Sequence, residues 1–297
     1  MTVQTIHPVL ATAGGLRRVD GVDLFEGERI TALRADAGAL WVLAGKRDLY
    51  RLEGDSPELV ASLDDGVTGT CLGTHDGAVW VGGDPAALWR LRDARFERVA
   101  SFEAAPTHED WHTPWGGPPA VFSMASDGAD LYVSVHVGGI MRSGDGTSWT
   151  PTIDLHDDVH QVAVGPDGTV WAATGMRGLA ESNDRDATWR YHTQGLHATY
   201  LLAVAVVEDA VLVGASSGHA GRDGAVYRFD GSQFARVSGL PDRLGGAVGP
   251  RQLDAAGDDA VVALPNGDVF TSSDGGRNWT VAMSGVGAVS EVVLPRS

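Results

Sequence analysis

Cysteine is almost absent from this sequence of 297 residues, in which Cys71 is the only one. No disulfide can therefore form within the chain. The opening residues lack the basic segment and the long apolar run of a secretory signal, so we expect a cytoplasmic protein. No apolar run approaches the roughly 20 residues that a membrane-spanning helix requires. These absences argue against secretion and against a membrane-spanning segment.

Positive charge is also scarce in the sequence. Lysine and arginine total 22 against 39 aspartates and glutamates, which gives a formal net charge of -17. A surface of this sign repels phosphate backbones and anionic lipid, so we expect no nucleic-acid partner and no membrane association. The sequence also lacks a phosphate-binding Gly-Lys-Ser/Thr loop, a dinucleotide fingerprint and a Gly-x-Ser-x-Gly elbow. We therefore expect no nucleotide cofactor.

Glycine is abundant, with 40 residues spread evenly, together with 13 prolines, through a repeated unit of about 40 residues. Each unit contains an alternating strand, a turn, a strand of the form Ala-Val-Trp-Val-Gly-Gly and two further strands. The second strands of successive units align at Trp41, Trp80, Tyr132, Trp171, Leu212 and Val262. Period-two alternation occurs throughout, whereas helical periodicity is nearly absent. The unit is typical of one four-stranded β-propeller blade, and we expect almost no helix.

Six complete blades and two end fragments account for the chain. The complete blades are predicted at about 29–65, 66–102, 119–155, 159–196, 200–238 and 251–285. Residues 286–297 are predicted to form one inner strand, and residues 1–28 about three more strands. Pairing the two ends in one sheet would close the ring and remove its exposed strand edges. We therefore predict an all-β fold, a single seven-bladed β-propeller domain over 1–297, with six or eight blades as alternatives.

Three turns carry a more specific pattern. The segment from Ser272 to Trp279 fits S-x-D-x-G-x-[TN]-W, the segment from Ser182 to Trp189 fits it with one exception, and 143–149 is one residue shorter. In such a turn the aspartate accepts backbone N–H groups, glycine allows a positive φ, and tryptophan packs between blades. The chain here resembles the Asp-box (BNR) repeat propellers, a broad group that includes sialidases. The resemblance implies a propeller fold, in which these turns are structural and lie away from the channel.

The resemblance extends more narrowly to uncharacterised actinobacterial propellers of the sialidase-like and YVTN-like kind. Four segments carry it, namely WHTPWGGPP (111–119), VHVGGIMRS (135–143), DVHQV (158–162) and HATY (197–200). This group implies no settled activity. Sialidase chemistry is not predicted, because the sequence has no Arg-Ile-Pro element before the first box and no assignable arginine triad with a Tyr and Glu nucleophile pair.

Histidine is concentrated at one predicted face of the ring. In a propeller, the loops between blades and the loops between second and third strands lie at the same end, where binding sites gather. Seven of the ten histidines fall in or beside such loops. Because histidine is the most common metal ligand, we predict a site for one divalent ion, with Zn, Fe, Mn and Cu all open. The predicted ligands come from adjacent connections and are His112, His136, His160 and His197.

Acidic residues in the same loops are the predicted catalytic groups, namely Glu109, Asp157 and Asp158. They would complete the metal ligands or support the histidines, or they are ordinary solvated loop acids. The run from His108 to His112 also matches H-E-x-x-H. A zincin needs that motif on a helix, and Pro106 and Pro114 leave too little room for one.

Two tryptophans and two arginines are the predicted ligand-binding residues. Trp111 and Trp115 lie in the longest departure from the repeat, where they either line a pocket at the channel mouth or pack on neighbouring blades. Arg222 lies in a second insertion (216–224), and Arg251 directly follows a third (239–250), both at the same face. Arg251 opens an inner strand, so it would point into the channel toward a ligand carboxylate or phosphate, or else pair with an acid of the protein.

Three functions are compatible with these features. The first is an enzyme whose metal-containing pocket acts on a small polar molecule by Lewis-acid chemistry, with hydrolysis, elimination and oxygen chemistry all open. The second is a non-catalytic propeller scaffold that holds a protein partner, a peptide or another ligand on the same face. The third is a glycosidase with paired carboxylates such as Asp110 and Asp157.

Overall fold

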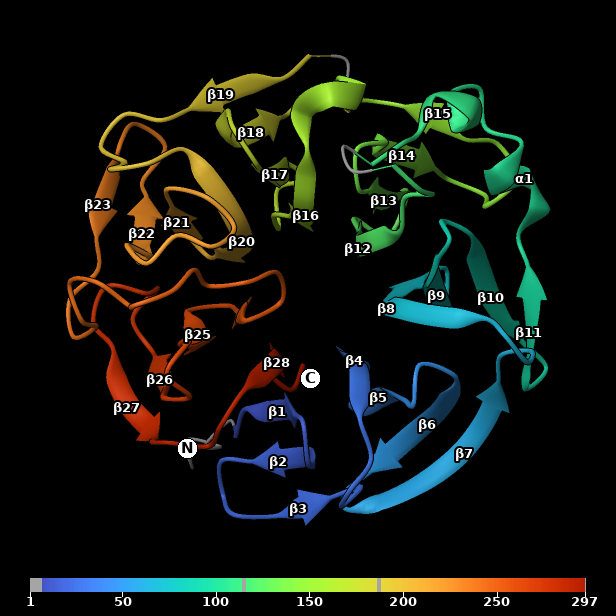
Figure 1. The fold of residues 1–297 in the computed structure, drawn as a ribbon, viewed down its shortest axis with the longest axis horizontal. Helices are drawn as coiled ribbons and strands as arrows, with labels where there is room; N and C mark the ends of the chain where they lie inside the picture. Colours follow the sequence, from blue (N-terminus) through green and yellow to red (C-terminus); the bar gives the residue numbers. More distant parts are fainter. Residues whose placement is uncertain (1–6, 114–115, 186–187, 297) are drawn as a thin grey trace.

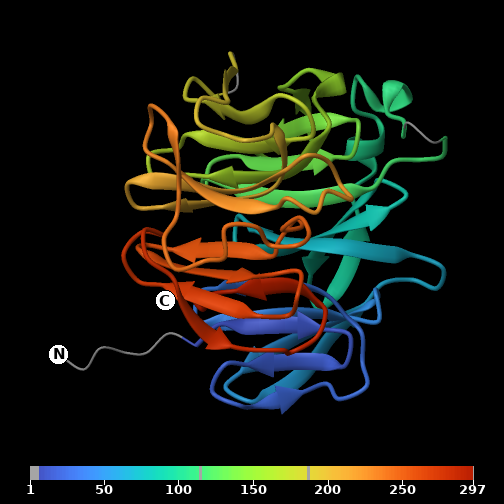
Figure 2. The ribbon, with the colours of Figure 1, turned by 60° about the vertical axis from the view of Figure 1, so that its left-hand side comes forward.

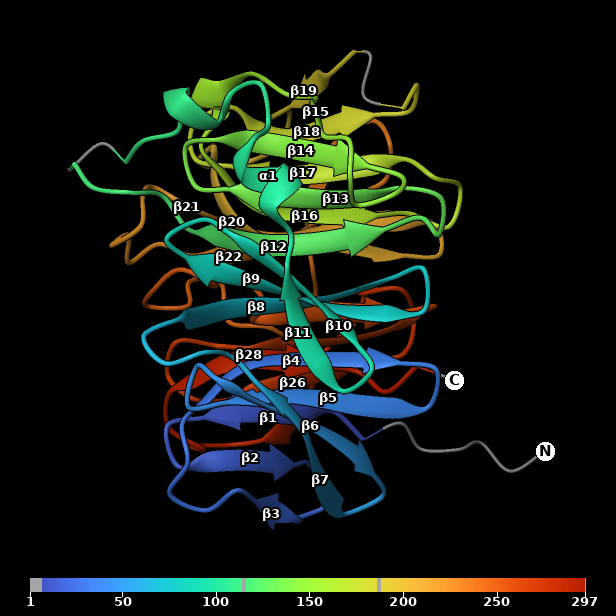
Figure 3. The ribbon, with the colours of Figure 1, turned by 90° about the vertical axis from the view of Figure 1, so that its right-hand side faces the viewer.

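The computed structural model describes residues 7–113, 116–185 and 188–296. Its strands form seven four-stranded antiparallel sheets arranged in a ring (Figure 1). The predicted all-β fold with seven blades is therefore confirmed. Seen from the side, the sheets follow one another round the ring, and their strand ends gather at two opposite faces (Figures 2 and 3).

Each blade takes its name from its innermost strand. The first three complete blades consist of β4 (Ile30–Asp36), β5 (Ala39–Ala44), β6 (Asp48–Glu53) and β7 (Ser56–Ser62); β8 (Thr68–His75), β9 (Ala78–Asp84), β10 (Leu88–Arg92) and β11 (Arg95–Arg98); and β12 (Val121–Ser126), β13 (Leu131–Val135), β14 (Gly139–Ser143) and β15 (Thr150–Pro151).

The next three blades continue in the same order round the ring. They consist of β16 (Val159–Val164), β17 (Val170–Thr174), β18 (Gly178–Ser182) and β19 (Arg190–His192); β20 (Tyr200–Val207), β21 (Ala210–Ser216), β22 (Ala225–Phe229) and β23 (Phe234–Arg236); and β24 (Leu253–Ala256), β25 (Asp259–Ala263), β26 (Val269–Ser272) and β27 (Thr280–Met283).

The seventh blade joins the two ends of the chain. Its strands, from the centre outward, are β28 (Val289–Val293), β1 (Val9–Thr12), β2 (Gly15–Arg18) and β3 (Asp23–Leu24). Strand β28 pairs antiparallel with β1, so that Val293 faces Val9 and Val292 faces Leu10. The predicted closure of the ring by its terminal strands is confirmed, and every inner strand of the ring belongs to a complete sheet.

Helix is nearly absent, as expected. In the described ranges there is one short α-helix, α1 (Ala100–Glu103), and two single 3₁₀ turns, η1 (His108–Asp110) and η2 (Leu155–Asp157). None of these is long or apolar enough to cross a membrane.

The strand order defines two faces of the ring. Inner strands begin at one face, which we call the top face, and end at the other, the bottom face. Because neighbouring strands are antiparallel, the loops between blades and the loops from second to third strands lie at the top face. The hairpins after the inner strands and the turns before the outer strands lie at the bottom face.

The core consists of apolar layers between adjacent blades. Trp80 on β9 is 1% exposed and packs in one cluster with Leu131 and Val133 of the next blade. The layers are tight, since a Cβ atom added at Gly82 would lie 2.5 Å from a methyl group of Val121. Interleaving of this kind supplies most of the stabilisation of an all-β ring and fixes the angle between blades.

The three turns with the aspartate pattern connect third to fourth strands at the bottom face. In the last of them, Oδ1 of Asp274 accepts the backbone N–H groups of Arg277 and Asn278, each at 3.0 Å. Trp279 then packs in the cluster between the β20 and β24 blades. Asp145 likewise accepts two backbone N–H groups in the turn after β14. These turns stabilise the outer strands far from the top face.

Candidate metal centre at the top face

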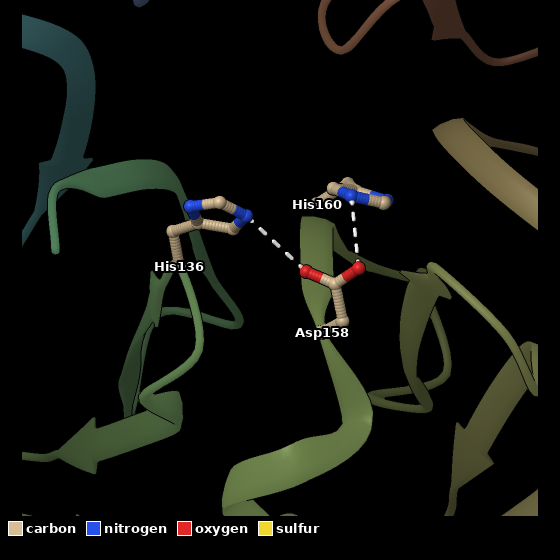
Figure 4. Close-up of side chains that lie close together, drawn as sticks. All are labelled: His136, Asp158 and His160. Carbon is tan, nitrogen blue, oxygen red and sulfur yellow. Dashed lines mark ion pairs between the residues drawn. The ribbon is translucent and has the colours of Figure 1, made fainter. Parts of the chain in front are cut away.

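Three side chains from two neighbouring blades converge at the top face, namely His136, Asp158 and His160. His136 directly follows β13, Asp158 directly precedes β16, and His160 is the second residue of β16. One ligand atom from each lies within 4.8 Å of the others, and within the described ranges this is the one such group. The two imidazole rings approach the carboxylate from different sides (Figure 4). Two imidazoles and one carboxylate form a ligand set used for divalent transition metals.

The ring of His160 is held in one tautomer. Its Nδ1 atom lies 2.7 Å from the backbone oxygen of Leu201, and because that oxygen can only accept, Nδ1 carries the proton. Nε2 therefore presents a lone pair, 3.5 Å from Oδ2 of Asp158 and 3.3 Å from the hydroxyl of Tyr200. Burial lowers the pKa of the His160 ring, although the Asp158 carboxylate acts in the opposite direction. A neutral ring anchored through Nδ1 is the usual state of a metal-ligating histidine.

His136 faces the other carboxylate oxygen of Asp158. Its Nε2 atom lies 3.2 Å from Oδ1, and its ring stacks on Phe122 with centroids 4.5 Å apart and an interplanar angle of 11°. This stacking holds the plane of the imidazole. The centroids of the His136 and His160 rings are 6.2 Å apart, so the two nitrogens flank the carboxylate.

Asp158 is positioned by its backbone and by an adjacent glycine. Its φ of 50° lies in the left-handed region, and its carbonyl oxygen accepts the N–H of Gly175 at 2.9 Å. The His136 side chain lowers the pKa of the Asp158 carboxyl against the opposing effect of burial. Although His136 lies within ion-pair distance, Oδ1 is buried without a hydrogen bond of good geometry. The carboxylate therefore keeps an acceptor position for a further group.

The other two predicted metal ligands lie apart from this group. Nδ1 of His112 lies 3.0 Å from the backbone oxygen of Asp110, and its ring is 6.1 Å from that of His156. His197 lies 2.9 Å from the hydroxyl of Tyr227 through Nδ1. Two of the four predicted histidines thus meet, and the third member of the group is Asp158, one of the predicted catalytic acids.

The remaining predicted acids have different surroundings. Asp157 is 3% exposed and accepts hydrogen bonds from Arg177, at 2.8 Å, and from the hydroxyl of Tyr191. These contacts make it a structural residue of the β16 blade. Glu109 lies in the exposed 3₁₀ turn η1. That turn has three residues, so the H-E-x-x-H run does not form the helix that a zincin site requires.

The four predicted ligand-binding residues do not gather at one site. Trp111 is 7% exposed and packs on Phe102 with ring centroids 5.1 Å apart, so packing on a neighbouring blade is the interpretation that fits it. Trp115 lies outside the described residues. Arg222 is exposed in the loop after β21. Arg251 lies 3.4 Å from Oε2 of Glu291, so it pairs with an acid of the protein.

Sequence reasoning missed three residues around the centre. Phe122 supports His136, Tyr200 faces His160, and a Cβ atom at Gly175 would lie 2.1 Å from Oδ2 of Asp158. The loop that follows Gly175 carries Met176, which is 79% exposed. Tyr200 had a signal in the sequence, because it opens the inner strand next to β16 and so must lie beside His160.

No family model matches this sequence, and no curated protein matches it. Solved structures do match its fold. A GH74 enzyme of Niastella koreensis matches 95% of this chain with a TM-score of 0.70 at 14% identity, and the match covers 53% of that enzyme. The chain therefore spans about half the length of that enzyme.

Two smaller propellers match over most of both chains. YCF48 bound to a D1 peptide matches 90% of this chain and 89% of its own, with a TM-score of 0.63 at 14% identity. A catalytically inactive virginiamycin B lyase from Staphylococcus aureus, solved with quinupristin, matches 95% of this chain and 85% of its own, with a TM-score of 0.60 at 12% identity. At these identities the matches show the propeller fold alone.

Proposed function

We propose that this propeller is a metal-dependent enzyme in which His136, Asp158 and His160 bind one divalent ion at the top face. The ion would act as a Lewis acid on a small polar molecule. Support comes from the way in which ligand atoms of two blades converge, and from the mixed functions of propellers with this fold, which include a lyase and a GH74 enzyme.

The arrangement of lone pairs carries this proposal. Because Nδ1 of His160 donates to Leu201, the lone pair of Nε2 and the oxygen Oδ2 of Asp158 stand 3.5 Å apart. The Tyr200 hydroxyl can donate to Nε2, but among the described residues no positive centre lies between Nε2 and Oδ2, so the two electron-rich atoms repel each other. A divalent cation in contact with these atoms and with Nε2 of His136 would remove the repulsion, and the site would hold it with one negative and two neutral ligands.

Tyr200 gives the site a hydrogen-bond donor. Its hydroxyl lies 3.3 Å from Nε2 of His160, and burial raises the pKa of this hydroxyl, so it remains protonated near neutral pH. When an ion takes the lone pair of Nε2, this hydroxyl no longer donates to His160, and we assign it the role of orienting a bound molecule by donating a hydrogen bond to its oxygen or nitrogen. Met176, exposed on the neighbouring loop, offers an apolar contact at the rim.

Metal analysis tests the proposal. Tag-free protein is incubated in turn with Zn²⁺, Mn²⁺, Fe²⁺ and Cu²⁺, freed of excess ion, and assayed by mass spectrometry. We expect about one equivalent of one of these metals in the wild type and less than about 0.2 equivalents in His160→Ala and His136→Ala. The matched control is His192→Ala, because His192 also pairs with an acid of the β16 blade, Glu181 at 2.7 Å.

Two outcomes would overturn the metal centre. One is a wild type that retains less than about 0.2 equivalents of every ion, and the other is equal retention by wild type and His160→Ala. The first outcome, combined with recovery of a defined peptide on the top face, would favour a binding scaffold, a role suggested by YCF48 bound to a D1 peptide.

The kinship that we propose for the chain is with the Asp-box propellers, including their uncharacterised actinobacterial sialidase-like members. The aspartate turns support it, since Asp274 and Asp145 each accept two backbone N–H groups. A glycosidase activity has less support, because Asp157 is committed to Arg177 and Tyr191. Failure to cleave a panel of aryl glycosides is the expected result.

A further inference from the structure

A large cavity occupies the centre of the ring on the side away from the metal centre. Its volume is about 1300 Å³. Its walls include residues of the bottom-face hairpins, such as Ser126, Pro166 and Glu208. The cavity therefore extends to the bottom face, and the three proposed metal ligands are not part of its wall.

Arg251 and Gln161 lie at the inner end of this cavity. The backbone N–H of Arg251 donates to Oε1 of Gln161 at 2.9 Å, and its Nη1 donates to the carbonyl oxygen of Thr70 at 2.7 Å. Arg251 adopts a φ of 63°, which is unfavourable for a residue with a side chain. Contacts with other blades hold it in this conformation and place its guanidinium across the channel.

The charge of the cavity is opposite to that of the protein. Four arginines and three acids line it, and burial raises the pKa of one of these acids, Glu291, so the walls carry a positive excess in a chain whose formal net charge is -17. These residues are Arg18, Arg34, Arg251, Arg296, Glu208, Asp254 and Glu291. Most of the wall between them is apolar and includes Leu33, Leu72 and Val162. A small excess of positive charge in an apolar cavity attracts a single negative charge more strongly than water-exposed arginines do.

Arg34 has unused hydrogen-bonding capacity. Among the described residues it makes one hydrogen bond, from Nε to Oγ1 of Thr74 at 3.2 Å. Its two terminal nitrogens, with four N–H groups, have no protein acceptor in that part of the chain. Burial and the nearby Arg296 lower the pKa of Arg34 to about 10, so its charge is incompletely compensated. The fork of a guanidinium matches the two oxygens of a carboxylate.

A second pair of groups in the cavity is also incompletely satisfied. Glu291 is 5% exposed, and its Oε2 has no hydrogen-bond partner although Arg251 lies 3.4 Å away. Nε of Arg251 is likewise buried without a partner. Buried polar atoms are normally paired, and unpaired ones mark places where a ligand or ordered solvent binds.

We propose that this cavity is a second binding site, which takes a small organic monocarboxylate through the guanidinium of Arg34. One negative charge offsets the charge of Arg34, which, unlike the other three arginines of the wall, lies within ion-pair distance of no acid among the described residues. The apolar wall fits the hydrocarbon part of the ligand. The site opens at the bottom face, so its ligand need not pass the metal centre.

Titration calorimetry with hexanoate and benzoate as probes tests this site. EDTA is present throughout, so that the probes cannot bind through a metal at the top face, and success or failure here is independent of the proposed enzyme. We expect binding of at least one probe, and about a ten- to hundredfold weaker binding by Arg34→Gln. Arg92→Gln is the matched control, because Arg92 is an exposed arginine of the outer strands, and it is expected to bind like the wild type.

Three results would overturn the carboxylate site. They are an absence of binding of either probe at millimolar concentration, equal binding of the neutral hexanamide and benzamide, and unchanged binding by Arg34→Gln. Tighter binding of inorganic phosphate than of both carboxylates would overturn the assignment of ligand class. Circular dichroism and thermal unfolding of Arg34→Gln establish that any loss of binding occurs in a folded protein.

Discussion

The carboxylate of Asp158 occupies the space beside Gly175 in which any other residue would carry its side chain, since a Cβ atom there would lie 2.1 Å from Oδ2. Gly175→Ala is therefore expected to displace the carboxylate and to weaken metal binding about ten- to a hundredfold. Competition with a chromogenic chelator measures this affinity. Gly14→Ala is the control, because a Cβ atom at Gly14 meets nothing within 4 Å. Equal affinities for the two variants would contradict the assigned role of Asp158.

Asp157 and Asp158 are neighbours with opposite expected phenotypes. Asp158→Asn removes the negative ligand, and we expect metal affinity to fall by more than about 100-fold with little change in stability. Asp157→Asn weakens the buried contacts with Arg177 and Tyr191, and we expect it to retain metal but to lose about 1–3 kcal/mol of unfolding free energy. Urea unfolding and metal analysis on both variants separate the two effects. If the phenotypes are exchanged, the metal centre as described is wrong.

Glu291 makes stability depend on pH in a direction unusual for a carboxylate. Burial raises the pKa of Glu291 to about 7, although Arg251 acts in the opposite direction. The folded state therefore holds this proton more tightly than the unfolded state does. The stabilisation is complete below the ordinary carboxyl pKa and is lost as the pH rises through about 7, by at most about 3 kcal/mol.

Comparison with Glu291→Gln isolates that contribution. Between pH 5 and pH 8, the unfolding free energy of the wild type is expected to fall relative to that of the variant, as measured by urea unfolding. Glu58→Gln, at an exposed position of β7, is expected to show no such trend. A constant difference between wild type and Glu291→Gln over this range would mean that Glu291 stays ionised when folded.

Asp274 is expected to matter for stability and not for the top face. Asp274→Ala leaves two backbone N–H groups of its turn without their acceptor, so we expect a loss of about 1 kcal/mol in unfolding free energy. Metal content should be that of the wild type, because the turn lies at the bottom face. Thermal unfolding and metal analysis check the two parts. A loss of metal without a loss of stability would show that the aspartate turns have a role beyond structure.

The ring could be predicted from the sequence because its signals are local and repeated. Period-two alternation with a tryptophan such as Trp80 or Trp171 marks the second strand of a blade without any knowledge of its neighbours. The meeting of β28 with β1 followed from a different argument, namely that an open ring leaves strand edges unpaired.

The candidate site was less predictable, because its contacts cross between blades and depend on side-chain directions. His136 and His160 could be placed at one face, but nothing in the sequence distinguished them from His112. In the structure, the ring of His112 instead contacts the backbone oxygen of Asp110. Asp157 and Asp158 are adjacent and chemically identical, and only the left-handed backbone of Asp158 turns its side chain toward the histidines. The cavity around Arg34 could not be found at all, since it exists only when seven inner strands enclose it.

The order of synthesis exposes the seventh blade to mispairing between two chains. Strand β28 leaves the ribosome after all six complete blades, whereas β1 is among the first segments made. Until β28 has been made, the backbone N–H and C=O groups on the inner edge of β1 have no strand to pair with. A strand of another chain can then form hydrogen bonds with this edge. When two chains are synthesised close together, β28 of one chain can pair with β1 of the other. Crowded expression should therefore yield interlocked dimers that interconvert with monomers only by unfolding.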